Sequence, residues 1–89
     1  SHDAPPIWHI GQNVQGEYLG QKFTGKLKAL RDLGGRNWAL TVVFDAAVDV
    51  ATSEHITNLR KQVNCTLNAH GTTTARTSNG KPQMMLKAV

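Results

Sequence analysis

The sequence is short of several kinds of residue, and each shortage narrows the functions it can have. It contains one cysteine, Cys65, so no disulfide can form within the chain, and a reducing compartment is predicted. It contains no apolar run of the roughly 18 residues that a membrane-spanning helix needs. We therefore expect a cytoplasmic protein with no membrane partner.

Acidic residues are missing from one end of the chain. No Asp or Glu follows Glu54, so the last 35 residues hold five Lys and Arg side chains and no acidic side chain to offset them. The first 54 residues carry five basic and six acidic groups, which nearly cancel. A segment of one charge attracts polyanions, and phosphate backbones are the commonest polyanion that a small domain meets.

Patterns that support catalysis or metal binding are also missing. His9, His55 and His70 lie far apart, and none has a second His or Cys at a ligand spacing, so a zinc site is not expected. Asp45 and Asp49 lie on either side of an expected bend, where carboxylates commonly mark strand ends. We expect no enzymatic activity, no catalytic residue, no metal and no cofactor.

The length and the positions of proline and glycine predict a single domain. A chain of 89 residues can bury one modest core. Pro5-Pro6 blocks regular structure and Ser1-His2 is typical of a tag remnant, so residues 1–10 are interpreted as a leader arm and residues 11–89 as one small β-rich domain. Four glycines from Gly11 to Gly25 recur every four to five residues, as in a bent first strand of a small barrel.

Alternating apolar residues predict an antiparallel hairpin. Residues 23–30 alternate apolar and polar side chains with a basic outer face, and residues 38–45 alternate in the same way. Gly34-Gly35 lies between the two runs and supplies a turn. This hairpin is the strongest structural prediction that the sequence allows.

A short helix is predicted after the hairpin. Thr52 or Ser53 can cap it, and Glu54 places negative charge in its first turn. One apolar stripe follows at helical spacing: Ile56, Leu59 and Val63.

Three further strands are expected over residues 63–70, 72–77 and 83–88, with Asn79-Gly80 as a hairpin turn. The predicted fold class is therefore α+β: a β-rich small barrel or half-barrel of about five antiparallel strands with one α-helix, in the order β-β-α-β-β-β.

Nucleic-acid binding is the leading functional hypothesis, with single strands as the expected partner. Proteins that bind single strands combine a basic groove with exposed aromatic rings. The expected phosphate-binding residues are Lys26, Lys28, Arg76, Lys81 and Lys87, and the expected stacking residues are Trp8 and Tyr18. Two alternatives stay open: a solvated basic surface without a ligand, and a protein-interaction or accessory module that uses an exposed strand edge at residues 72–77.

Two resemblances accompany these observations. The expected strand order and the basic hairpin at residues 72–83 resemble oligonucleotide-binding barrels. The phrases at residues 20–25, 44–50 and 76–82 resemble a small bacterial domain found in proteins described as glyoxalase-related, over roughly Trp8 to Leu86. That domain prefers Pro where this chain has Ala47.

The glyoxalase-related resemblance implies little chemistry. Glyoxalases themselves hold a metal with His and Glu ligands across a paired βαβββ module. No such ligand set can be mapped onto this chain, so the resemblance supplies no catalytic residue.

Overall fold

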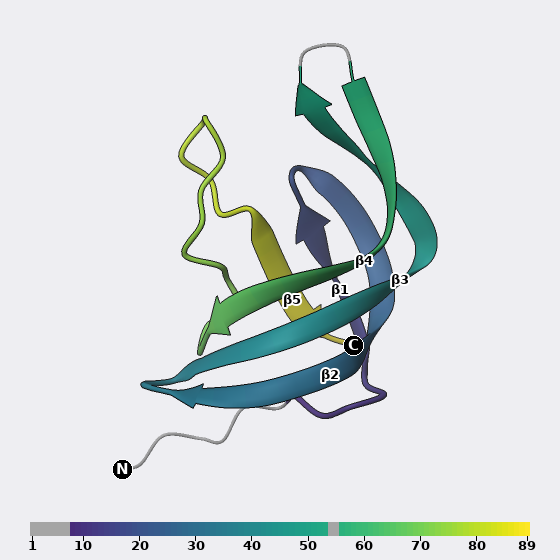
Figure 1. Ribbon diagram of the computed structural model, residues 1–89. Coiled ribbons are helices and arrows are strands. Elements are labelled where there is room, and N and C mark those ends of the chain that lie inside the picture. The colour runs from purple at the N-terminus through teal and green to yellow at the C-terminus, as the bar shows by residue number, and fades with distance from the viewer. Residues whose placement is uncertain (1–7, 54–55) are drawn as a thin grey trace.

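The protein forms one antiparallel sheet (Figure 1). The structure is a computed structural model that describes residues 8–53 and 56–89, and the side chains of residues 51–57 are not described. Its five strands are β1 (Asn13–Tyr18), β2 (Gln21–Gly34), β3 (Asn37–Ser53), β4 (Ile56–Asn68) and β5 (Met84–Ala88). They lie side by side in the order β4-β3-β2-β1-β5, so β4 and β5 are the two edges. Consecutive strands from β1 to β4 are neighbours, as tight hairpin connections require.

The predicted helix is not found, and the α+β class is wrong. The described residues contain no helix, and the segment expected to be helical belongs to β4, which pairs with β3 from Ser53↔Ile56 to Asn37↔Asn68. Leu59, a member of the predicted apolar stripe, is 70% exposed. The segment is rich in Thr, Asn, Val and Cys, which are weak helix formers, and about ten residues cannot sustain an isolated helix. Hydrogen bonding along β3 therefore decides its conformation.

The predicted β2–β3 hairpin is confirmed. Its two central turn residues, Gly35 and Arg36, have φ angles of 60° and 64°, as a type I′ turn requires. The β1–β2 hairpin uses the same geometry at Leu19 and Gly20, with φ angles of 51° and 85°. Both turns match the right-handed twist of the strands that they join.

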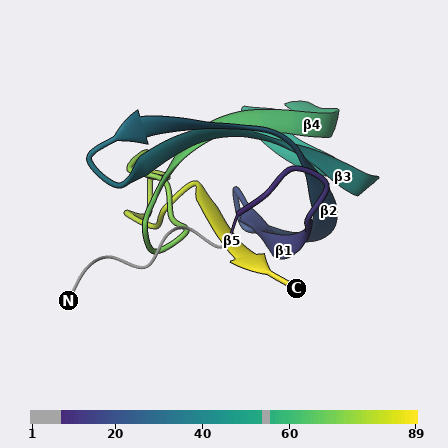
Figure 2. The same ribbon diagram turned by 90° about the horizontal axis from the view of Figure 1, so that it is seen from below.

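The core lies on the concave side of a strongly curled sheet. Viewed from below, β1 and β5 lie opposite β3 and β4 (Figure 2). The five most completely buried side chains come from all five strands: Val14, Leu27, Val42, Leu67 and Met84. The sheet is nevertheless open, because its two edge strands do not pair with each other, so of the predicted barrel or half-barrel the closed barrel is wrong.

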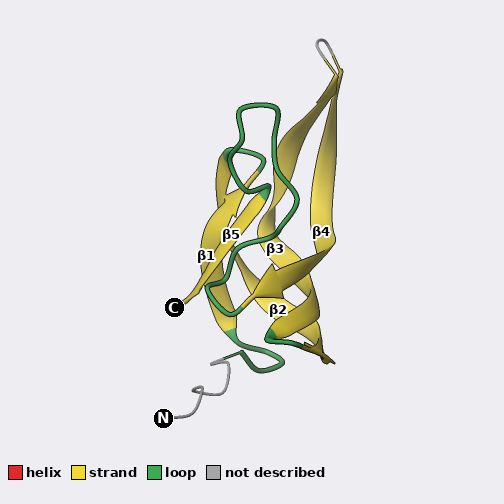
Figure 3. Cartoon of the chain, turned by 90° about the vertical axis from the view of Figure 1, so that its left-hand side faces the viewer, coloured by secondary structure: helices red, strands yellow, loops and turns green. Residues whose placement is uncertain are grey.

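The connection between β4 and β5 covers the open side of the core (Figure 3). Thr73 is buried; its N–H donates to the carbonyl of Met84, and its hydroxyl accepts a hydrogen bond from the N–H of Met84. The strand predicted over residues 72–77 is reduced to isolated bridges, which include Leu67↔Thr73 and Thr72↔Met85. The alternative of a protein-interaction module that uses residues 72–77 as an exposed strand edge stays a prediction.

The hairpin of β3 and β4 extends beyond the rest of the sheet (Figure 1). The pairing of β3 with β4 shifts register between Val43 and Val48. Val43 pairs with Gln62 and Val48 pairs with Arg60, so a step of five residues along β3 corresponds to a step of two residues along β4. β3 therefore bulges and bends at this point, and it leaves β2 after the last pair that the two strands form, Gly25↔Phe44.

Candidate functional site

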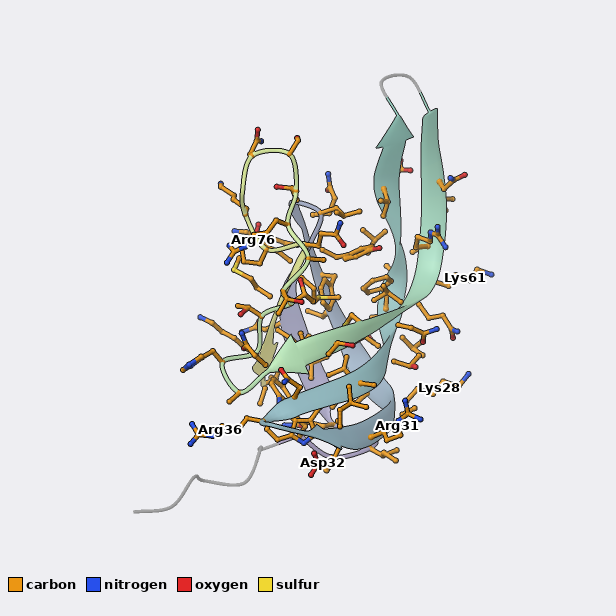
Figure 4. All side chains as sticks on the ribbon, turned by 60° about the vertical axis from the view of Figure 1, so that its left-hand side comes forward. Lys28, Arg31, Asp32, Arg36, Lys61 and Arg76 are labelled. Carbon is orange, nitrogen blue, oxygen red and sulfur yellow. The ribbon has the colours of Figure 1, made fainter. Side chains whose placement is uncertain are left out.

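Exposed cations gather on the outer surface of β2, β3 and β4. Lys28, Arg31 and Lys61 lie on the same side of the molecule and point away from it (Figure 4). Lys26 is exposed on β2 and shares the outer face of the sheet with its paired neighbours Val43 and Gln62. We call the surface that carries Lys26, Lys28, Arg31 and Lys61 the basic face.

A β-bulge in β2 places two of these cations. The register shifts between Leu27 and Ala29, so Lys28 and Ala29 together face Thr41 of β3. Lys28 and Arg31 are three residues apart, so in a regular strand without the extra residue their side chains would point to opposite faces. With it, Leu27 and Leu30 stay on the core side while both cations lie outside.

A groove of about 460 Å³ lies beside the basic face, and Arg31 is the one of the four cations that lines it. Small and polar side chains make up most of its lining: Ala29, Ala39, Thr41, Asn64 and Thr66. The Thr41 hydroxyl donates to the amide oxygen of Asn64 at 2.6 Å, which fixes both side chains on the groove floor. A floor of small residues lets a polymer backbone approach the sheet while the long basic side chains reach around it.

No ion pair neutralises the basic face. Within the described ranges, none of Lys26, Lys28, Arg31 and Lys61 is paired with a carboxylate. Asp32, the next residue after Arg31, lies at the hairpin end (Figure 4), where its side chain accepts a hydrogen bond from the N–H of Gly34 at 2.8 Å. The four cations are thus left to interact with solvent or with a ligand.

The phosphate-binding residues expected from the sequence lie on different surfaces of the molecule. Lys26 and Lys28 lie on the basic face, whereas Arg76 lies on the opposite side of the molecule (Figure 4). The Arg76 guanidinium donates to the carbonyl of Gly80 at 3.0 Å and so braces its own loop, which also carries Lys81. Lys87 is exposed on β5, at a separate groove described below.

The rings of Trp8 and Tyr18, which were expected to stack on bases, are not fully exposed. Trp8 is 9% exposed and belongs to the core. Tyr18 is half-buried with its ring 6.1 Å from that of Phe44. The remaining aromatic residues, Phe23, Trp38 and Phe44, are buried. The basic face therefore has no ring on which a base could stack.

Sequence reasoning missed Arg31 and Lys61. Arg31 was placed beyond the end of a strand that in fact continues to Gly34, and Lys61 was assigned to the last turn of the predicted helix. The alternation of Val63, Cys65 and Leu67 extends β4 backward through Lys61, but it would direct Lys61 to the core side. The outward position of Lys61 accompanies the register shift opposite it, which no sequence pattern indicates.

A second and larger groove, of about 1010 Å³, lies where β2 and β3 diverge. β2 contributes Gln21–Thr24 and β3 contributes residues 46–49. Its charged residues are of both signs: Glu17 and Asp49 against Lys22 and Lys87. Such a groove has no preference for a polyanion.

The described residues do not form a metal site. No three His, Cys, Asp or Glu side chains among them lie close enough together to hold a metal ion, and the His55 side chain lies outside the described residues. No buried polar side-chain atom in the described part of the chain lacks a hydrogen-bond partner. Burial raises the pKa of the Cys65 thiol from 9.0 to about 11, which leaves it protonated and unreactive at neutral pH.

Comparison with known proteins identifies the family. A family model described as "Glyoxalase superfamily protein" matches residues 1–88, and the chain belongs to this family. The search of curated proteins gives no significant match, and neither does the search of solved structures. The resemblance to glyoxalase-related proteins is thus confirmed at the family level, and the resemblance to oligonucleotide-binding barrels is not.

Membership places the chain in an enzyme-related superfamily without supplying an active site. The described strands follow one another without the helix of a βαβββ module, and the described His, Cys, Asp and Glu side chains do not gather into a metal site. No described helix is present that could span a membrane.

Proposed function

We propose that this protein is a binding domain, not a catalyst, and that it binds the phosphate backbone of nucleic acids through the basic face. The observation that supports the proposal is the gathering of four cations without acidic partners on one surface, next to a groove that Arg31 and several small residues line. Guanidinium and ammonium groups arranged in this way can contact successive phosphates while the backbone lies in the groove.

The buried aromatic residues refine this proposal. Single-strand binders gain affinity by stacking bases on exposed rings, and the basic face has none. Binding should therefore depend on phosphate contacts alone. It should be insensitive to sequence, sensitive to salt, and without the preference for single strands that the sequence suggested.

An amide chemical-shift titration tests the proposal. Short duplex DNA and oligothymidine are added to the labelled protein at about 50 mM and about 200 mM salt, a range over which phosphate contacts weaken strongly. We expect saturable shifts for residues 26–31, 39–43 and 61–66 with both DNAs, and much smaller shifts at the higher salt concentration.

Two outcomes would overturn the proposal. The absence of shifts at the lower salt concentration would show that the basic face is only solvated. Shifts confined to residues 76–87 would place binding on the C-terminal segment instead. Titration with polyglutamate is the control, because a carboxylate polymer that binds equally well would show that the face is not selective for phosphate.

A further inference from the structure

On the outer surface of the sheet, residues of β2, β3 and β4 line up in three rows. From β2 to β4, the paired residues are Arg31, Ala39 and Thr66 in the first row, Ala29, Thr41 and Asn64 in the second, and Lys26, Val43 and Gln62 in the third. Lys28 lies next to Ala29 in the bulge of β2 and gives the second row its cation. Every row therefore has a cation on β2 and an uncharged hydrogen-bonding side chain on β4.

A strip of short side chains separates the cations from the polar side chains of β4. Ala39, Thr41 and Val43 supply this strip, and all three are partly buried. Neighbouring strands lie about 4.8 Å apart, so the backbones of β2 and β4 are about 10 Å apart, and successive rows are about 7 Å apart. The polar side chains of β4 thus face the groups that flank a phosphate backbone held along β2.

The polar side chains of β4 have hydrogen-bonding groups that the protein does not use. The Thr41 hydroxyl donates to the amide oxygen of Asn64 at 2.6 Å, a typical distance for an O–H···O bond, so the amide N–H groups of Asn64 point elsewhere. In the described part of the chain, these N–H groups make no hydrogen bond, and neither do the side chains of Gln62 and Thr66. All three side chains are exposed. Donors and acceptors are therefore available along β4, beside the line of cations.

The chemical group that fits such a row is the ribose 2′-hydroxyl. It lies on the sugars between successive phosphates, and it both donates and accepts hydrogen bonds. Amide and hydroxyl side chains can satisfy both capacities without carrying a charge. The deoxyribose of DNA has no hydroxyl at this position, so against DNA the same side chains would lose contact with water and gain no partner.

The shape of the surface favours a duplex. The basic face lies on the convex side of the curled sheet, away from the core (Figure 2), and it has no exposed ring on which an unpaired base could stack. An RNA duplex displays its 2′-hydroxyls in a wide and shallow minor groove, which a convex surface can contact. Such contacts are to sugar and phosphate, so they do not depend on the base sequence.

We propose that Gln62, Asn64 and Thr66 contact ribose 2′-hydroxyls, and that the protein therefore prefers RNA duplexes to DNA duplexes. This inference rests on the proposed function, because the cations must hold the phosphates for the row on β4 to meet the sugars. It adds a discrimination that the cations alone cannot make, since RNA and DNA have the same phosphates.

Fluorescence anisotropy with three labelled duplexes of one sequence, at about 50 mM salt, tests this inference. The duplexes are RNA, DNA and 2′-O-methyl RNA. We expect RNA to bind at least about tenfold more tightly than DNA, because hydrogen bonds to several hydroxyls are gained. The 2′-O-methyl duplex keeps its phosphates and its A-form shape, but its 2′-oxygens no longer donate and carry bulky methyl groups. Its affinity should fall to about that of DNA.

The outcomes separate this inference from the proposed function. Equal affinity for RNA and DNA, or tighter binding of DNA, would overturn the inference and leave the proposed function in place. Binding of the 2′-O-methyl duplex as tight as that of RNA would also overturn it, because A-form shape alone would then explain the preference. Binding of no duplex at all would overturn both.

Two double variants locate the contact on the protein. Gln62→Ala with Asn64→Ala removes two of the three polar side chains, so the ratio of RNA affinity to DNA affinity should fall to about two or less. The matched control, Asn13→Ala with Gln15→Ala, removes the same two residue types from exposed positions on β1, which lies opposite β3 and β4 (Figure 2). The control should keep the ratio of the unmodified protein. An unchanged ratio in the first variant, or an equal fall in both, would contradict the assignment.

Discussion

Replacing Lys28 and Lys61 together by glutamine should weaken the salt dependence of DNA binding in a calculable way. Both side chains are exposed on the basic face, one from β2 and one from β4, so glutamine removes charge without disturbing the core. If the four cations of the face each contact one phosphate of duplex DNA, the logarithm of the affinity falls with the logarithm of salt concentration with a slope of about −3.6. The double variant retains two contacts and a slope of about −1.8.

These slopes translate into measurable affinities. Between about 50 mM and about 200 mM salt, the unmodified protein should lose about 150-fold in affinity, and the double variant only about 12-fold. Fluorescence anisotropy with a labelled duplex, repeated over a series of salt concentrations, gives both values. The variant should also bind more weakly than the unmodified protein at the lower salt concentration.

The matched control replaces Lys81 and Lys87, which are equally exposed but lie away from the basic face, by glutamine. Both double variants have the same net charge, so a general electrostatic attraction would weaken them equally. Equal slopes for the two variants would refute the reasoning. A smaller slope for the Lys81/Lys87 variant than for the Lys28/Lys61 variant would restore the C-terminal segment as the binding surface.

Three further predictions concern stability and reactivity. Gly16→Ala should lower the free energy of unfolding by about 1–3 kcal/mol in urea denaturation, because the new Cβ would overlap the neighbouring backbone carbonyl of β5; an unchanged midpoint would contradict this close approach. Leu67→Ala, at a fully buried position, should lower the free energy of unfolding by about 2–5 kcal/mol. Leu59→Ala, at a side chain that is 70% exposed, should change it by less than about 0.5 kcal/mol. Similar losses for the two variants would show that β4 packs differently. Burial raises the pKa of Cys65 from 9.0 to about 11, so iodoacetamide should alkylate the folded protein at about pH 8 roughly a hundredfold more slowly than the unfolded chain. The contribution of this pKa shift to the free energy of unfolding should be lost as pH rises from about 9 to about 11. Equal alkylation rates would show that the thiol is solvated.

The β2–β3 hairpin could be predicted because its signals are local. Alternating side chains on either side of Gly34-Gly35 specify both the strand period and the turn, and no distant contact is needed to choose between conformations. The same alternation identified core residues correctly, since Leu27, Val42 and Phe44 are all buried. Long-range information became necessary only where a local pattern fitted two structures.

β4 is the element for which the local pattern was ambiguous. Ile56, Leu59 and Val63 have helical spacing, yet alternation from Val63 onward fits a strand equally well. The choice depends on β3, which continues to Ser53 and offers a partner along almost the whole of β4. Because the helix was assumed, Lys61 was separated from Lys28 in the predicted structure, and the candidate site was assembled from cations that the fold keeps apart.

One irregularity in β3 shapes the basic face. Strict alternation after Phe44 would place Ala46 on the core side, but it is exposed, because the register shift between Val43 and Val48 inserts extra residues opposite Lys61. The resulting bend directs the far half of β3 away from β2 beyond the Gly25↔Phe44 pair. It also places Lys61 beside the paired region that carries the other three cations.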